Sequence, residues 1–363
     1  MAENKVTRRQ FVCTGAAAAA GLAAGAAGAA GQPKSKILNY NEKMEYRRLG
    51  KTNLMVSAIS LGGHWKRLDK QVTLAKKAGP GWMGAFLADP AFRKNRHEIV
   101  SRCIDVGINY VDACSGAEVL AYAEALRGRR DKMYFGYSWY EYEMRFHPWR
   151  DSLDKMMEGL DSGLRQAKLD YVDFWRISME MPTARNQTAK EVETAMEALR
   201  LAKKQGKARF TGVSSHDRLW LKEAIETYPA QMEAICTPYT ADSKVLPEDS
   251  LFDAAGKCDV GIFGIKPFAS NSLFKGDSSP DSPHAAEDDR LARLAIRYIL
   301  CNPAVTSPMP GLVSIHQVDN VVKALAERRQ LDLAEAAELQ EAMDEAWAKL
   351  PPDYQWLKDW EYV

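Results

Sequence analysis

The sequence lacks the patterns that mark several common protein classes. Its six cysteines form no C-x-x-C pair, which argues against an iron–sulfur cluster or a zinc ribbon. It has no long basic run, and its formal net charge of +1 gives no indication of a surface for nucleic acid. No G-x-G-x-x-G motif opens a helix after an apolar run, so the usual fingerprint of a doubly wound dinucleotide-binding sheet is absent.

The composition is that of a globular protein. The chain has 363 residues, of which 46% are hydrophobic and 27% are charged, and it is long enough to bury a large core. This length allows two domains, but it also suits a single α/β barrel.

The N-terminal segment differs from the rest of the chain. Arg8 and Arg9 are followed by the apolar Phe11 and by a tract of small residues over 15–31, a pattern that resembles a twin-arginine export signal. A membrane anchor is the alternative, but a tract made mostly of Ala and Gly inserts poorly into a bilayer. We therefore expect residues 1–31 to be a twin-arginine signal peptide. The twin-arginine export machinery would be a partner, and the mature protein would be periplasmic or extracytoplasmic, with no stable membrane span.

After a polar linker over 32–43, strand and helix patterns alternate along the chain. Residues 44–57 read as two short strands around a turn that contains Gly50. Eight apolar runs then follow, each succeeded by a longer amphipathic stretch. These runs cover 58–63, 109–114, 133–139, 171–178, 208–215, 234–239, 260–268 and 304–308. Eight such units predict an α/β fold of the (β/α)8 TIM barrel type over 44–350, with an extra C-terminal helix over 333–350.

Two segments lie outside this alternation. Residues 65–94 form a long insertion after the first strand, and residues 351–363 form an aromatic tail. In a barrel the insertion opens on the face that carries the active site. The tail either packs across a barrel face or covers the pocket as a lid.

Several motifs resemble the aldo/keto reductase family. The most specific are the hairpin at 44–57, the run Gly107-Ile108-Asn109-Tyr110-Val111-Asp112, and the segments 169–174 and 206–214. The resemblance implies that the hairpin plugs the bottom of the barrel. It also implies a nicotinamide cofactor, NADP or NAD, and carbonyl reduction by hydride transfer with a Tyr, Lys, Asp and His at the active site.

The resemblance transfers only part of that catalytic set. Asp112 matches the Asp, whereas the chain runs from Asp112 straight into a helix without the expected Tyr. Ser138 stands at the position of the Lys and Ser178 at that of the His.

Residues that would bind the cofactor also follow from the resemblance. Ser214, Ser215, Cys236 and Lys266 occupy positions that contact the nicotinamide end. On the adenosine side, Gly311, Ser314, Gln317 and Asn320 match a motif in which a helix N-terminus meets the ribose phosphate.

Three interpretations of function remain open. The favoured one is an oxidoreductase acting on a small polar, sugar-like substrate, with Asp112, Tyr137, His216 and Lys266 as catalytic candidates and Tyr122 and His64 as alternatives. The second is a non-redox barrel in which Asp112, Glu180, His64, His216, Lys266 and Arg176 carry out acid–base or metal-assisted chemistry, although no metal ligands are assigned. The third is a binding protein without catalysis, in which Trp65, Trp139 and Trp175 stack on sugar rings.

Overall fold

The computed structural model describes residues 37–74, 87–179, 187–243 and 249–358. The predicted signal peptide, and with it the predicted export, lies outside these residues, as do Glu180 and the end of the aromatic tail. No helix in the described ranges combines the length and the apolar character that crossing a membrane requires.

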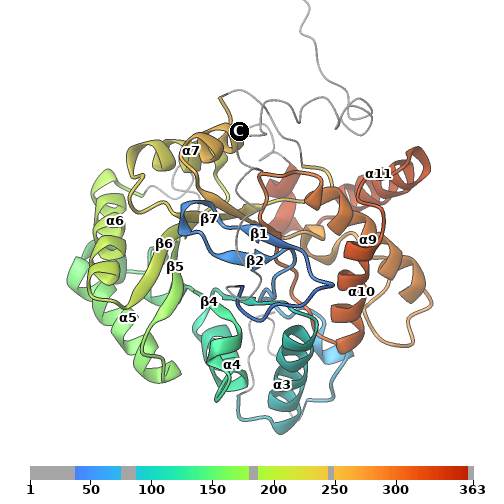
Figure 1. Ribbon diagram of the computed structural model, residues 1–363, viewed down its shortest axis with the longest axis horizontal. Helices are drawn as coiled ribbons and strands as arrows, with labels where there is room; N and C mark the ends of the chain where they lie inside the picture. The colour runs from blue at the N-terminus through green and yellow to red at the C-terminus, as the bar shows by residue number, and fades with distance from the viewer. Residues whose placement is uncertain (1–36, 75–86, 180–186, 244–248, 359–363) are drawn as a thin grey trace, which may run out of the picture.

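A curled parallel sheet forms the centre of the molecule, with helices around it (Figure 1). Seven strands are hydrogen-bonded in the order of the sequence. They are β3 (Tyr110–Ala113), β4 (Tyr134–Tyr137), β5 (Val172–Ser178), β6 (Ala208–Ser214), β7 (Ala234–Pro238), β8 (Gly261–Ile265) and β9 (Ser307–Pro308). Sequential order with helical crossovers is the topology of a (β/α)8 barrel.

The segment predicted as the first strand closes this sheet into a barrel. On one side Leu61 pairs with β3, since its N–H donates to Tyr110 O over 3.0 Å and its carbonyl accepts from Asp112 N over 2.8 Å. On the other side the N–H of Ser60 donates to Pro308 O over 3.1 Å, beside β9. The predicted barrel is therefore confirmed. β9 is short because Pro308 and Pro310 lack the N–H that a ladder needs.

The surrounding helices follow the predicted alternation. They are α3 (Pro90–Asp105), α4 (Gly116–Ala125), α5 (Leu153–Ala167), α6 (Ala189–Lys204), α7 (Arg218–Thr227), α8 (Leu251–Lys257), α9 (Ala285–Leu300) and α10 (Ile315–Ala326). α3 begins earlier than the predicted insertion boundary because Asp89 caps it and Pro90 occupies its first turn. α5 begins at Leu153, directly after its cap Ser152.

The N-terminal hairpin fills the bottom of the barrel. β1 (Tyr46–Arg48) pairs antiparallel with β2 (Met55–Ser57). Leu49 and Val56 are fully buried and belong to an interior cluster with Tyr110 and Phe263, whose rings stack 4.2 Å apart. Because the hairpin closes this end of the barrel, we expect the active site at the opposite end, where the parallel strands finish. We call that end the mouth.

Both flanking segments pack against the barrel. In the predicted linker, the Asn39 side chain donates to Ile104 O over 2.8 Å at the end of α3. α11 (Leu333–Ala348) follows α10 and leads into a 3₁₀ segment (Pro352–Lys358) of the aromatic tail. There the Tyr354 ring lies 4.1 Å from Lys66 Nζ and 5.9 Å from Lys266 Nζ, so this part of the tail reaches the mouth.

Candidate functional site

Asp112, the one family residue that the sequence retains, is locked in a buried ion pair. Nε of Arg176 on β5 donates to Asp112 Oδ1 over 2.9 Å and to Oδ2 over 3.1 Å, and Nη2 also donates to Oδ2. Both side chains are buried, with Asp112 only 4% exposed. A two-pronged pair of this kind orients both partners strongly. Arg176 therefore takes the place of the missing Lys as the partner of Asp112.

Gly136 makes room for this pair. β4 lies between β3 and β5, and Gly136 stands level with Asp112 in the register. A Cβ atom at Gly136 would lie 2.5 Å from Asp112 Oδ1 and would also collide with the Tyr110 hydroxyl. Because glycine has no side chain, Arg176 can reach across β4 to β3.

The positions of the absent Lys and His are joined by a second buried carboxylate, Glu143. Its Oε2 accepts hydrogen bonds from Ser138 Oγ over 2.6 Å and from Ser178 N over 2.8 Å. Trp139 N and Trp175 Nε1 donate to the other oxygen over 3.0 Å each. Burial raises the pKa of Glu143, and these four donors oppose that rise. No sequence pattern indicated this role, since Glu143 lies in a loop without periodicity.

The two tyrosines proposed as proton donors do not face Asp112. Tyr137 pairs with Ala113 in the sheet, so its side chain leaves the opposite face of β4 from the one at Gly136. Its hydroxyl packs against Gly163 of α5. This geometry does not support a catalytic role for Tyr137. The Tyr122 hydroxyl donates to Gly62 O over 2.6 Å and accepts from Trp65 Nε1 over 2.9 Å, so it is structural.

Lys266 lies at the mouth directly after β8, where it has a left-handed φ of 56°. Burial lowers the pKa of its amine to about 8, and the nearby cations Lys66, Arg145 and Arg176 act in the same direction. An amine with this pKa exchanges its proton near neutral pH. His216, the other predicted acid, is half-buried just after β6.

The residues predicted for the nicotinamide end are mostly tied to the barrel itself. Ser214 ends β6, and Ser215 Oγ accepts from Asp217 N over 3.1 Å at the start of α7. Cys236 is fully buried in the interior cluster, and its carbonyl accepts from Ser215 N over 3.1 Å. Burial raises the pKa of the Cys236 thiol, so it is an inert packing group.

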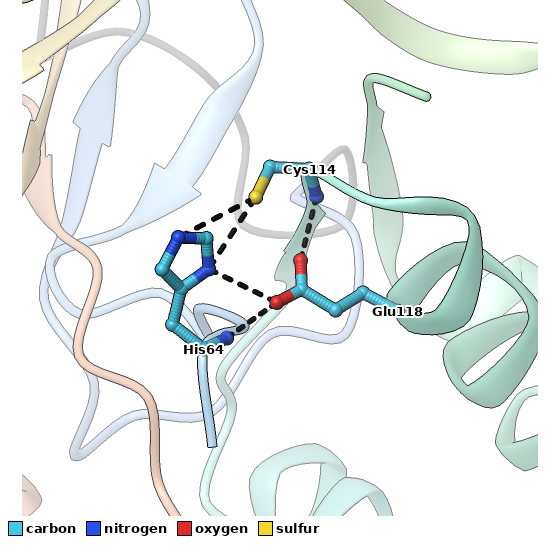
Figure 2. A group of neighbouring side chains, drawn as sticks. All are labelled: His64, Cys114 and Glu118. Atoms are coloured by element: carbon cyan, nitrogen blue, oxygen red, sulfur yellow. Dashed lines mark hydrogen bonds and ion pairs between the residues drawn. The ribbon is translucent and has the colours of Figure 1, made fainter. Parts of the chain in front are cut away.

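A further cluster at the mouth consists of His64, Cys114 and Glu118 (Figure 2). Glu118 Oε1 accepts from His64 N over 2.5 Å and lies 3.0 Å from His64 Nδ1, while Oε2 accepts from Cys114 N over 2.7 Å. Burial alone would raise the pKa of Glu118, but the His64 ring and the two N–H groups lower it to about 2. In the sequence, Ser115-x-x-Glu118 has the form of a capping box at the start of a helix, and Ser115 does cap α4. The Glu118 carboxylate, however, binds His64 and Cys114, so the pattern alone does not reveal this cluster.

A cavity of about 480 Å³ lies between α9, α10 and the loop that follows β8. All four residues predicted for the adenosine side line it, namely Gly311, Ser314, Gln317 and Asn320. Ser314 caps α10, so the N-terminus of this helix opens on the cavity. Lys66, from the insertion after the first strand, also lines it and adds a cation that the motif itself lacks.

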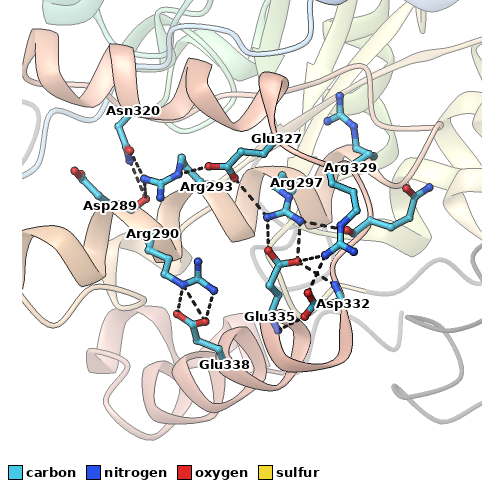
Figure 3. A network of polar contacts seen from close by, with 12 residues as sticks. Asp289, Arg290, Arg293, Arg297, Asn320, Glu327, Arg329, Asp332, Glu335 and Glu338 are labelled. Atoms are coloured by element: carbon cyan, nitrogen blue, oxygen red, sulfur yellow. Dashed lines mark hydrogen bonds and ion pairs between the residues drawn. The ribbon is translucent and has the colours of Figure 1, made fainter.

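An ionic network holds the helical wall behind this cavity (Figure 3). Arg293 of α9 donates to Asn320 Oδ1 over 2.6 Å, and Asn320 in turn donates to Asp289 O over 2.9 Å. Arg297 binds both oxygens of Glu335 over 2.8 Å each, which ties α9 to α11. The residues predicted to bind adenosine, Ser314, Gln317 and Asn320, thus lie along a helix that is braced against α9.

Comparison with known proteins agrees with this architecture. The sequence profile of the aldo/keto reductase family matches residues 81–344. The chain belongs to the aldo/keto reductase family. It is 24% identical to L-galactose dehydrogenase of Arabidopsis thaliana, over 85% of this chain and 95% of the relative. It is 22% identical to the uncharacterized oxidoreductase YqkF of Bacillus subtilis, over 79% and 92%.

Solved structures show the same fold. An aldo-keto reductase of Bacillus halodurans in its holo form superposes with a TM-score of 0.59 at 21% identity, covering 82% of this chain and 96% of its own. An aldo-keto reductase of Klebsiella pneumoniae in complex with NADPH superposes with a TM-score of 0.57 at 18% identity, covering 82% and 94%.

Proposed function

We propose that this protein is an NAD(P)(H)-dependent oxidoreductase that interconverts a carbonyl and an alcohol on a small polar, sugar-like substrate. The observation that carries the proposal is the cavity lined by Gly311, Ser314, Gln317 and Asn320. Its volume lies within the range of cofactor sites. The N-terminus of α10 favours an anionic group there, and Lys66 adds positive charge.

The backbone approaches itself closely beside the cavity, and a solved relative offers a candidate nucleotide. A Cβ atom at Gly311 would collide with the carbonyl of Gly63, so this glycine lets two loops meet at the edge of the cavity. A related aldo-keto reductase, from Klebsiella pneumoniae, is known with NADPH bound. The same nucleotide is the first candidate for this chain, and NADH is the second.

The catalytic set in this proposal differs from the family's. The nicotinamide supplies or accepts the hydride, and the protein has to supply the proton. Lys266 is the proposed donor to the carbonyl oxygen, because its pKa of about 8 lets it give up a proton near neutral pH. Asp112, neutralised by Arg176, keeps a fixed charge pair beneath the mouth.

We also propose that residues 1–31 direct export of the folded protein. Such a protein would work where no free pool of NADPH exists. The nucleotide would then stay bound, and a second substrate would return it to its starting redox state. Replacement of Arg8 and Arg9 by Lys should keep the protein in the cytoplasm, whereas Lys5→Arg should not. Equal export of the parent and of both variants would contradict the proposed export.

The function is tested by purifying the protein without added nucleotide. Absorbance and mass of any released small molecule should identify a nicotinamide dinucleotide. Small sugar-like carbonyls can then be screened for oxidation of NADPH and NADH, with Lys266→Met as the comparison. Absence of nucleotide, together with no binding of either nucleotide at millimolar concentration, would contradict the redox proposal.

A further inference from the structure

The cluster of His64, Cys114 and Glu118 brings together three donor atoms of different chemistry. His64 Nδ1 lies 3.3 Å from Cys114 Sγ and 3.0 Å from Glu118 Oε1, and one ligand atom from each residue falls within 4.8 Å of the others. Tetrahedral zinc with nitrogen, sulfur and oxygen ligands requires ligand atoms about 3.3–3.7 Å apart. Only small side-chain movements separate the cluster from that arrangement.

The donors are held in place before any ion binds. The Glu118 carboxylate accepts from the main-chain N–H of both His64 and Cys114, so it ties together the two segments that carry the other donors. Oε2 keeps a second lone pair for a cation, and the one on Oε1 that faces His64 Nδ1 is freed when that nitrogen binds the ion in its unprotonated form. His64 adopts a left-handed φ of 56°, and a Cβ atom at the preceding Gly63 would collide with the Glu118 carboxylate. The backbone here is thus shaped around the carboxylate.

Charge also fits a divalent cation. The Cys114 thiol would release its proton to solvent as the ion binds, and the resulting thiolate and the Glu118 carboxylate would together compensate two positive charges. Lys266 and Arg176 act on His64 as nearby cations and oppose binding, but Arg176 is already neutralised by Asp112. A set of imidazole, thiolate and carboxylate favours zinc-type ions over Mg²⁺ or Ca²⁺, which take oxygen ligands.

We propose that His64, Cys114 and Glu118 form a three-ligand site for a zinc-type divalent cation at the mouth of the barrel. Three protein ligands leave one coordination position open, as in catalytic rather than structural zinc sites. The three ligands come from the loop after the first strand, the end of β3 and the first turn of α4. The proposal is independent of nucleotide binding, because the ion can be titrated without nucleotide.

The test is a titration of the chelator-treated, purified protein with Co²⁺, followed by Zn²⁺. One equivalent of Co²⁺ should produce the near-ultraviolet charge-transfer band of a cobalt–thiolate bond, and Zn²⁺ should abolish it, whereas Mg²⁺ should not. Cys114→Ser should remove the band. His64→Asn, in which Asn tolerates the left-handed backbone, should weaken Zn²⁺ binding at least about tenfold.

Cys258→Ser is the matched control, because this half-buried thiol lies outside the cluster, at the end of α8, and it should keep both the band and the affinity. Circular dichroism and the melting temperature establish that each variant is folded. Absence of the band, or its persistence in Cys114→Ser, would overturn the proposal. Binding of Co²⁺ without a thiolate band would also overturn it, since that places the ion elsewhere, for example at His147, Asp151 and Glu191.

Discussion

Arg176 and Asp112 face each other across β4 and form a buried, two-pronged ion pair. Asp112 is therefore paired with an arginine from β5, and Ser138, at the position where the resemblance places a lysine, donates to Glu143 instead. Asp112 and Ser138 are therefore bound to partners other than those that the family resemblance implies, and the redox reaction that we propose needs its proton from another residue.

The ion pair makes a first prediction about stability. Arg176→Met should leave the Asp112 carboxylate buried without its charged partner and lower the free energy of unfolding by about 3–5 kcal/mol. Adding Asp112→Asn to this variant should recover part of the loss, because the uncompensated charge is then gone. Denaturant unfolding of both variants measures this. A single variant within about 1 kcal/mol of the parent would contradict the described geometry.

Gly136 provides a second prediction. Gly136→Ala should destabilise the protein by about 1–3 kcal/mol, because the added methyl group meets Asp112 and the Tyr110 hydroxyl. Gly256→Ala, in α8, is the matched control, since a Cβ atom there meets nothing within 4 Å. The control should be neutral or slightly stabilising. Equal melting temperatures for the two variants would show that the space at Gly136 is not needed.

Lys266 provides a third prediction, on pH. Because burial lowers its pKa to about 8, the unfolded chain binds more protons than the folded chain between pH 8 and the ordinary lysine value of 10.5. The contribution of this group to stability therefore rises with pH across that window, by at most about 1.4 kcal/mol per pH unit. Lys266→Met should remove this slope. In the same window, carbonyl reduction should slow as the donor loses its proton, and an unchanged pH–rate profile in Lys266→Met would exclude Lys266 as the acid.

The network behind the cavity provides a fourth prediction. Arg297 donates to Glu335 and, with the N–H of Asp332, lowers the pKa of that carboxyl to about 2 (Figure 3). A depressed carboxyl pKa stabilises the fold above the ordinary value near 4.5 and loses that effect as the pH falls towards 2. Glu335→Gln should therefore flatten the fall in melting temperature between pH 5 and about 2. Glu341→Gln, on an exposed part of α11, should not, and identical curves for Glu335→Gln and the parent would contradict this role.

The sequence predicted the barrel, and it grouped the residues that line the cavity, because both depend on local patterns. Ser314, Gln317 and Asn320 belong to one helix start, so their common cavity follows from helical spacing. The sequence could not predict the partner of Asp112, since Arg176 lies 64 residues away and contacts it only because of the register of the barrel strands. Tyr137 was misjudged for a related reason, because the side on which a strand residue points depends on a register that the sequence alone does not fix.

Nucleotide binding in the cavity tests the central claim most directly. Ala285→Trp places a large side chain in the cavity wall at the start of α9, whereas Ala326→Trp places the same side chain on an exposed position at the end of α10. Binding of NADPH is measured by the fluorescence of the nucleotide. The account predicts that the parent and Ala326→Trp bind NADPH with equal affinity, and that Ala285→Trp weakens binding at least about tenfold, or about 1.4 kcal/mol. Equal binding by all three proteins, or no binding by the parent, would contradict it.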